Sequence, residues 1–157
     1  MPQEVWLVSA CLLGRRCRYD DKQVHTDVRE HLMARSAREL VPVCPEVEGG
    51  LPVPRPASML TGGDGHDVWT DRARLVDPEG NDVTRSFRVG AEVALERALQ
   101  HGATHACLKA RSPSCGSGMV WRDGVLQPGD GVTAARLKGA GLVVLTDEQL
   151  REGEPPG

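Results

Sequence analysis

Short apolar runs alternate along the chain with longer stretches of helical periodicity. Runs rich in Val and Leu, bounded by polar or turn residues, predict buried strands. The predicted strands cover residues 5–9, 39–43, 105–109 and 142–145. Pro42 indicates that the second of these strands lies at a sheet edge or ends there, because proline cannot donate to a ladder.

Residues 82–100 form the clearest predicted helix, because apolar side chains recur there at helical spacing. These positions are Phe87, Ala91, Ala94, Leu95, Ala98 and Leu99. Gly102 follows where a C-terminal cap belongs. Further helices are predicted over 27–35, with Thr26 as its cap, 132–138 and 146–150. The Gly- and Pro-rich segment 48–65 predicts a loop, and two extended pieces at 68–69 and 74–76 predict a hairpin.

Strands that alternate with helices predict an α/β fold. We expect a compact single domain over residues 1–157, with a mostly parallel, Rossmann-like sheet, flanking helices and a frayed tail at 152–157. In such sheets, ligands bind beyond the carboxyl ends of the strands. Cys11 follows the first strand, Cys44 ends the second and Cys115 lies in the loop after the third. The topology therefore predicts that these three thiols converge at one edge of the sheet.

Composition narrows the class of protein. The formal net charge is −3, which gives no general electrostatic case for binding a nucleic-acid polymer. The N-terminus lacks the features of a secretion signal, and no apolar stretch approaches the roughly 20 residues of a membrane helix. We therefore expect a cytoplasmic protein without a membrane partner. Since that compartment keeps thiols reduced, the five Cys favour metal binding or catalysis over disulfides.

Three segments carry the candidate chemistry: 9–14 (Ser-Ala-Cys-Leu-Leu-Gly), 44–46 (Cys-Pro-Glu) and 112–118 (Ser-Pro-Ser-Cys-Gly-Ser-Gly). The last is made almost entirely of small residues, which let backbone N–H groups approach an anion or a cluster, and which equally form an ordinary tight turn. The Cys spacings match neither the usual zinc sites nor the ferredoxin runs. Three scattered thiolates suit a 4Fe–4S cluster with one iron left open for a substrate.

The sequence resembles the thiouracil desulfidase family from about residue 8 to residue 144. The resemblance rests on the three segments above and on Cys17-Arg18-Tyr19-Asp20, Gly49-Gly50-Leu51-Pro52, Pro54-Arg55-Pro56, Asp82-Val83-Thr84, Gly90-Ala91, Leu108-Lys109, Asp123-Gly124 and 129–134 (Gly-Asp-Gly-Val-Thr-Ala). Two loops depart from the family pattern, at Asp21 and at 57–60 (Ala-Ser-Met-Leu), and they leave the substrate open.

The resemblance implies a 4Fe–4S cluster held by Cys11, Cys44 and Cys115. It also implies removal of sulfur from a small thiolated pyrimidine without net redox: the sulfur binds the open iron, water attacks the carbon, and sulfide leaves. Cys17 is a weaker candidate ligand. Cys107 lies in an apolar run and is expected to pack in the core.

The reaction needs a base, and a carboxylate beside the cluster suits that role. Glu46 is the first candidate and Glu48 the reserve; a salt-bridging role for Glu46 stays open. Ser112 and Ser114 are candidates to bind a pyrimidine carbonyl or a cluster sulfide, although Ser-Pro-Ser is also typical turn chemistry. Arg18 either binds an anionic substrate group or pairs with Asp20.

Two other classes of function remain open at this point. The cysteines also suit a non-enzymatic zinc or iron–sulfur module with a structural or sensing role. A thiol enzyme would use one Cys as nucleophile, but it requires a partner base, and no His motif supplies one.

Overall fold

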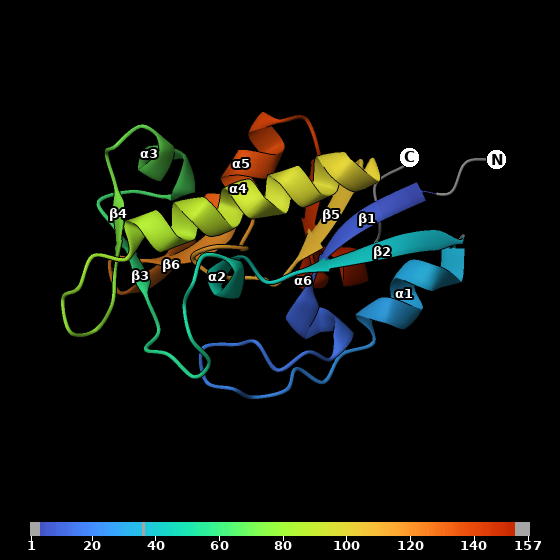
Figure 1. Ribbon diagram of the computed structural model, residues 1–157, viewed down its shortest axis with the longest axis horizontal. Coiled ribbons are helices and arrows are strands. Elements are labelled where there is room, and N and C mark those ends of the chain that lie inside the picture. Colours follow the sequence, from blue (N-terminus) through green and yellow to red (C-terminus); the bar gives the residue numbers. More distant parts are fainter. Residues whose placement is uncertain (1–3, 36, 153–157) are drawn as a thin grey trace.

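Four parallel strands form the main sheet of the computed structural model, which describes residues 4–35 and 37–152 (Figure 1). Their order is β2-β1-β5-β8. The strands are β1 (Glu4–Ser9), β2 (Arg38–Val43), β5 (His105–Leu108) and β8 (Val143–Thr146). The α/β class, the parallel sheet and the edge position of the strand that contains Pro42 are thereby confirmed.

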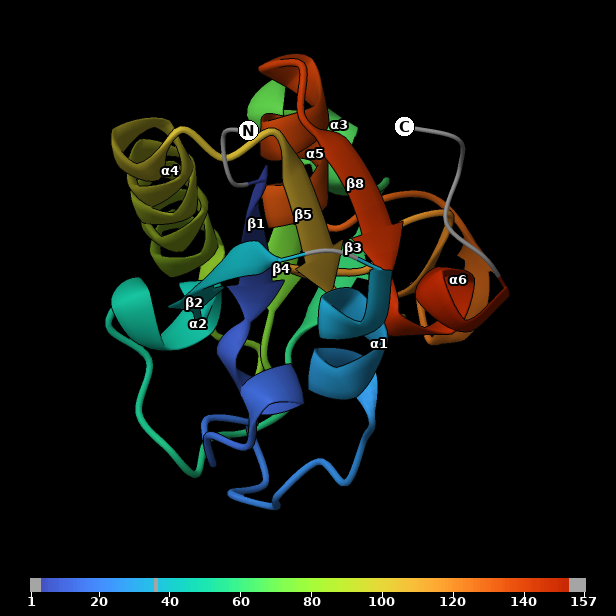
Figure 2. The ribbon, with the colours of Figure 1, turned by 90° about the vertical axis from the view of Figure 1, so that its right-hand side faces the viewer.

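Helices cover both faces of this sheet (Figure 2). α4 (Thr84–His101) and α5 (Val132–Gly139) pack on one face, where Leu7, Leu95 and Leu137 share a core. α1 (Val28–Arg35) and α6 (Asp147–Glu152) lie on the other face with the 3₁₀ helix η1 (Ala10–Leu13). Cys107 is buried in this second core, as predicted from its apolar surroundings.

A smaller mixed sheet in the order β4-β3-β6-β7 lies at one end of the molecule (Figure 1). Its strands are β3 (Met59–Thr61), β4 (Arg74–Val76), β6 (Met119–Arg122) and β7 (Val125–Pro128). α3 (Gly65–Trp69) and the first turns of α4 pack against it through Val68 and Phe87. Thus α4 belongs to the cores of both sheets and joins them.

Three local predictions are wrong. Residues 68–69 are helical in α3, because Asp64 and Asp67 form a capping box at its N-terminus. The partner of β4 is instead β3, which lies inside the predicted loop 48–65. The predicted loop also includes Glu48, which is the last residue of the short helix α2 (Pro45–Glu48). Of the predicted frayed tail, Glu152 ends α6, and residues 153–157 lie outside the described part of the chain.

The hairpin of β6 and β7 was missed, although Asp123-Gly124 between them is a strong turn signal. Asp123 and Gly124 have φ values of 49° and 80°, the conformation that such a two-residue turn requires. The hairpin extends the second sheet beside the Cys115 loop.

Two backbone segments approach each other closely where α2 crosses α4. A Cβ on Gly90 would lie 1.8 Å from the carbonyl oxygen of Pro45, and one on Gly49 would lie 1.9 Å from that of Ser86. Only glycine allows this approach. The crossing fixes α2, and with it Cys44 at the N-cap of α2, against the long helix.

Replacing Gly90 by Ala is expected to destabilise the fold and displace α2. Backbone must move to accommodate the methyl group, and such overpacking costs about 1–3 kcal/mol. The free energy of unfolding from chemical denaturation measures the effect. Gly139→Ala is the matched control, since nothing lies within 4 Å of its Cβ position; an equal loss in both variants would contradict the close-approach argument.

In the described ranges, the helices are too short or too polar for any of them to span a bilayer.

Candidate functional site

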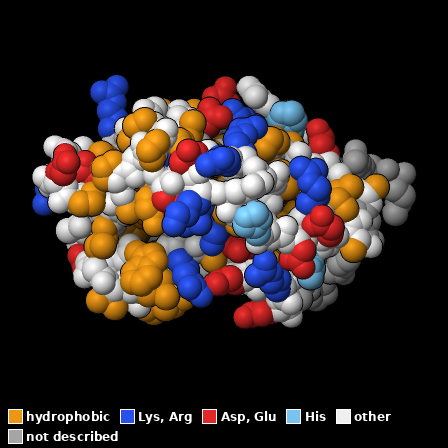
Figure 3. All heavy atoms as spheres, turned by 90° about the horizontal axis from the view of Figure 1, so that it is seen from below, with side chains coloured by type: hydrophobic (Ala, Val, Ile, Leu, Met, Phe, Trp, Pro, Cys, Tyr) orange, Lys and Arg blue, Asp and Glu red, His pale blue; other side chains and the backbone are white. Residues whose placement is uncertain are grey.

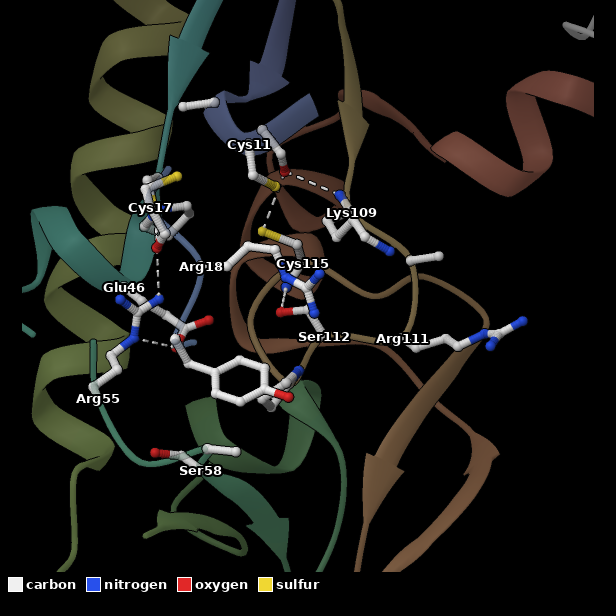
Figure 4. A pocket seen from close by; sticks show the side chains of 18 of the residues that line it. Cys11, Cys17, Arg18, Glu46, Arg55, Ser58, Lys109, Arg111, Ser112 and Cys115 are labelled. Carbon is white, nitrogen blue, oxygen red and sulfur yellow. Dashed lines mark hydrogen bonds and ion pairs between the residues drawn. The ribbon is translucent and has the colours of Figure 1, made fainter. Parts of the chain in front are cut away.

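A cavity of about 460 Å³ lies beyond the carboxyl ends of β1, β2 and β5 (Figure 4). Cys11, Cys44 and Cys115 all line it, together with Cys17. Because Ser9 is in register with Val43 on the neighbouring strand, η1 and α2 begin side by side. The predicted convergence of the three thiols at one edge of the sheet is confirmed.

The four thiols form two groups. Cys44 Sγ donates a hydrogen bond to the carbonyl oxygen of Cys17 at 3.6 Å. The free thiol of Cys17 also forms hydrogen bonds with the thiols of Cys11 and Cys44. Cys115 Sγ accepts a hydrogen bond from Ser9 Oγ at 3.5 Å. Thiols from three strand ends thus face a shared space.

Mutual contact and burial raise the pKa of three of these thiols, those of Cys17, Cys44 and Cys115. The hydrogen bond with the Cys11 thiol raises the pKa of Cys17 to about 11. Burial raises the pKa of Cys115 to about 12, and the hydrogen bond with Cys17 raises the pKa of Cys44. Because metals bind thiolates, loading this site with a metal is coupled to proton release.

The loop that carries Cys115 is held by its own serines. Ser112 Oγ accepts hydrogen bonds from the backbone N–H groups of Ser114 and Cys115, both at 3.1 Å. Ser114 Oγ is fully buried and bonds Thr133 Oγ1 at 2.8 Å. Ser112 lines the cavity. Ser114 does not, and its bond to Thr133 anchors the loop to α5.

The segment 129–134 supports the same loop from behind. The N–H of Thr133 donates to the carbonyl oxygen of Ser114 at 2.8 Å, and the N–H of Gly131 donates to that of Gly116. A Cβ on Gly131 would lie 2.4 Å from the Ser114 backbone. This sequence motif thus has a structural reason: it allows α5 to begin directly behind the Cys115 loop.

Glu46 lines the cavity from α2 and forms an ion pair with Arg55. Arg55 Nε lies 3.1 Å from Glu46 Oε1, and only 4% of the arginine side chain is exposed. The same guanidinium donates to the carbonyl oxygens of Cys17 and Pro52, both at 3.0 Å. Arg55 therefore ties the carboxylate of Glu46 to the Cys17 loop.

Glu48 and Arg18 take different positions. Glu48 pairs with Arg97 of α4 at 3.0 Å and, like Ser114, does not contribute to the cavity lining. Arg18 lines the cavity and also lies 3.7 Å from Asp20, so both of its predicted contacts are compatible with the structure.

Basic side chains outnumber acidic ones in the described lining. Arg18, Arg55, Lys109 and Arg111 contribute to it, against the single carboxylate of Glu46. Lys109 and Arg111 also contact acids of α6, at 4.0 Å and 2.7 Å. Arg18 and Arg55 pair with Asp20 and Glu46 in the same way, so each of the four basic side chains has a carboxylate nearby.

Sequence reasoning missed several lining residues. Arg55 stands in a Pro-Arg-Pro motif, but no local pattern indicates its ion-pair partner Glu46, nine residues away. Ser9 stands close to Cys11 in the sequence, but no local pattern indicates that its hydroxyl accepts a hydrogen bond from the N–H of Lys109 at 3.0 Å. Tyr19, Arg111 and Trp121 also line the cavity and were not predicted as site residues.

Soft thiol donors surround the cavity from several elements rather than from one short motif. Among the described residues, no three His, Cys, Asp or Glu side chains are grouped so that they would hold a metal ion as they stand. Thiolates of this kind are the ligands of iron–sulfur clusters, whose several irons accept ligands from different sides. The donor set fits such a cluster.

Known proteins similar to this chain include an iron–sulfur enzyme. A solved structure described as the [4Fe-4S]-dependent thiouracil desulfidase TudS has a TM-score of 0.78 and 38% sequence identity, covering 96% of this chain and 95% of that one. The uncharacterized protein YbbK of Bacillus subtilis (strain 168) is 38% identical over 149 residues, which are 93% of this chain and 97% of YbbK. The family model for 2-thiouracil desulfurase matches residues 6–149. The chain therefore belongs to the 2-thiouracil desulfurase family.

Proposed function

We propose that this protein hydrolyses the carbon–sulfur bond of a thiolated pyrimidine and releases sulfide, using a [4Fe-4S] cluster held by Cys11, Cys44 and Cys115. The observation that carries the proposal is the convergence of these thiols on one cavity beside the carboxylate of Glu46. The similarity to a [4Fe-4S]-dependent thiouracil desulfidase supports it. We further propose that the protein acts on small molecules in the cytoplasm, where thiols stay reduced.

The three proposed cluster ligands are the cysteines that follow the ends of parallel strands. Cys11, Cys44 and Cys115 each follow a different strand of the parallel sheet, so they reach the cavity from different directions. When bound, the cluster would supply a Lewis-acidic iron with an open position for the substrate sulfur. Cys17 lies against the thiols of Cys11 and Cys44 and is not assigned as a ligand.

Glu46 is the proposed general base. Its Oε1 is held by Arg55, so we assign proton uptake from water to the second oxygen, Oε2. The water oxygen bonds to the thiocarbonyl carbon as that carbon releases its sulfur. One thiocarbonyl and one water thus give one carbonyl and one hydrogen sulfide, without an external reductant or oxidant.

Ser112 is the proposed hydrogen-bond donor toward the reacting group. Its oxygen already accepts two backbone N–H groups, so its own hydrogen remains to be donated. Arg18, also in the lining, is proposed to bind a polar group of the substrate. Glu48 and Ser114 are not included, because their side chains bond Arg97 and Thr133.

Sulfide release from 2-thiouracil tests the function. Protein reconstituted with iron and sulfide without oxygen is expected to form equal amounts of sulfide and uracil. The same protein loaded with zinc is expected to be inactive. Equal activity of the two forms would contradict the proposal and favour a thiol enzyme. Absence of activity in both forms would contradict it and favour a non-enzymatic metal module.

Replacing Arg55 by Gln is expected to lower both stability and turnover. The change leaves the largely buried carboxylate of Glu46 and two carbonyl oxygens without their donor, and each such loss costs about 1–3 kcal/mol. Chemical denaturation and kcat measure the two effects. Arg111→Gln is the control for stability: its ion pair with Glu148 is half-exposed, so it contributes less than about 1 kcal/mol. Equal stability losses would show that Arg55 has no special role in the fold.

A further inference from the structure

The few aromatic residues of this chain are unevenly placed. The sequence contains three Trp, one Tyr and one Phe. Trp6 and Phe87 are buried in the cores, and Trp69 is partly buried, with Nε1 donating to the carbonyl oxygen of Val132. The other two, Tyr19 and Trp121, are 41% and 45% exposed, and both line the cavity. The two aromatic rings left most open to solvent are thus both found at the site.

The backbones that carry these rings are fixed by other lining residues. The N–H of Trp121 donates to the carbonyl oxygen of Arg111 at 3.3 Å, and β7 pairs with β6 on the far side. The carbonyl oxygen of Tyr19 accepts the N–H of Arg55 at 2.7 Å, and the Arg18 guanidinium lies 5.7 Å from the Tyr19 ring centre. The backbone that carries each ring is therefore fixed before a ligand arrives, so binding does not have to order these two segments.

Apolar side chains are concentrated at the end of the molecule that contains the second sheet. Viewed from below, hydrophobic atoms are concentrated over the half that contains the second sheet, whereas charged side chains occur over both halves (Figure 3). Trp121 belongs to β6 of the second sheet, whereas the basic lining residues Arg18, Arg55 and Lys109 come from loops outside it. The cavity thus combines an apolar aromatic wall with a polar one, as small-molecule sites commonly do.

We propose that Tyr19 and Trp121 form an aromatic subsite that stacks on the flat ring of the substrate and restricts the site to planar, unsaturated heterocycles. The proposal rests on the function proposed above and adds how the ring is selected. Aromatic faces stack on any planar base, and removing such a platform weakens binding by about tenfold or more. A saturated ring with the same polar groups lacks the flat face and gains little from the contact.

Uracil and 5,6-dihydrouracil are the matched probes, since they share their polar groups and differ in planarity. Their dissociation constants are measured by calorimetry on cluster-loaded wild type, Trp121→Leu and Trp121→Phe. Trp121→Leu is expected to weaken uracil binding about tenfold or more and to leave dihydrouracil binding within about threefold. Trp121→Phe keeps a flat ring and is expected to retain the preference for uracil.

Tyr19 and Met119 complete the series. Tyr19→Phe is expected to bind uracil like wild type, and Tyr19→Leu to lose part of the preference for the planar ring. Met119→Ala is the control, because Met119 is exposed on the same strand as Trp121 but lies outside the cavity lining. It is expected to leave both dissociation constants unchanged.

Three results would overturn the subsite: no uracil binding by wild type, equal weakening of both probes by Trp121→Leu, or equal effects of the Leu and Phe variants. Sulfide release from 2-thiouracil by the same preparations separates this proposal from the proposed function. Binding that follows the expected pattern without sulfide release would leave the aromatic subsite standing and refute the desulfidase. Sulfide release together with equal binding of uracil and dihydrouracil would support the desulfidase and refute the aromatic subsite.

Discussion

Replacing Cys11, Cys44 or Cys115 by Ser is expected to remove the cluster and abolish sulfide release. Each of these residues reaches the cavity from the end of a different strand, so each variant removes the thiol from one side of the cavity. A hydroxyl is a poor ligand for iron compared with a soft thiolate. After anaerobic reconstitution, wild type is expected to carry about four iron and four acid-labile sulfide per chain, and each of the three variants little of either.

The other two cysteines supply the controls. Cys107 is fully buried in the core below the sheet, so Cys107→Ala is expected to keep the wild-type content of iron and sulfide. Cys17→Ser is expected to keep its cluster as well, since Cys17 is not assigned as a ligand. A cluster that is lost with Cys107 or Cys17 and retained without Cys11 would show the ligand assignment to be wrong.

Replacing Glu46 by Gln is expected to keep the cluster and lower kcat by about 10²–10⁴-fold, the usual contribution of a general base. The amide matches the carboxylate in shape but does not accept a proton from water. It still presents an oxygen to the guanidinium of Arg55, so the site geometry is expected to persist. Sulfide release at saturating 2-thiouracil gives kcat, and iron content confirms that the cluster is present.

Glu48→Gln is the matched control for Glu46. The two carboxylates lie two residues apart on α2, but Glu48 pairs with Arg97 outside the cavity lining. Its neutralisation is expected to change kcat little. A large loss in Glu48→Gln with a small one in Glu46→Gln would exchange the proposed roles of the two residues.

The main sheet and the meeting of the thiols were predictable from the sequence for a physical reason. Parallel strands place their carboxyl ends at one edge, so residues that follow strands meet there whatever their separation in sequence. Cys11, Cys44 and Cys115 each follow such a strand. Buried strands such as β1 are continuous apolar runs, which are visible without knowledge of their partners.

Apart from the β6–β7 hairpin, the second sheet and the details of the site depend on pairings between distant segments, which no local pattern indicates. β3 has three residues, too few for a period to show, and it pairs with β4 on one side and with β6 on the other. The partner of Glu46 is Arg55, and Ser114 bonds Thr133, nineteen residues away. Such contacts follow from tertiary packing, so the sequence indicated the residue types and not their roles.

The most direct test of hydrolysis without net redox is the fate of the water oxygen. Cluster-loaded protein is incubated with 2-thiouracil in water labelled with heavy oxygen, with no reductant present, and the uracil is analysed by mass spectrometry. The account predicts one labelled oxygen in each uracil and one sulfide released for each uracil formed. Uracil without the label, or turnover that requires an added reductant, would contradict it.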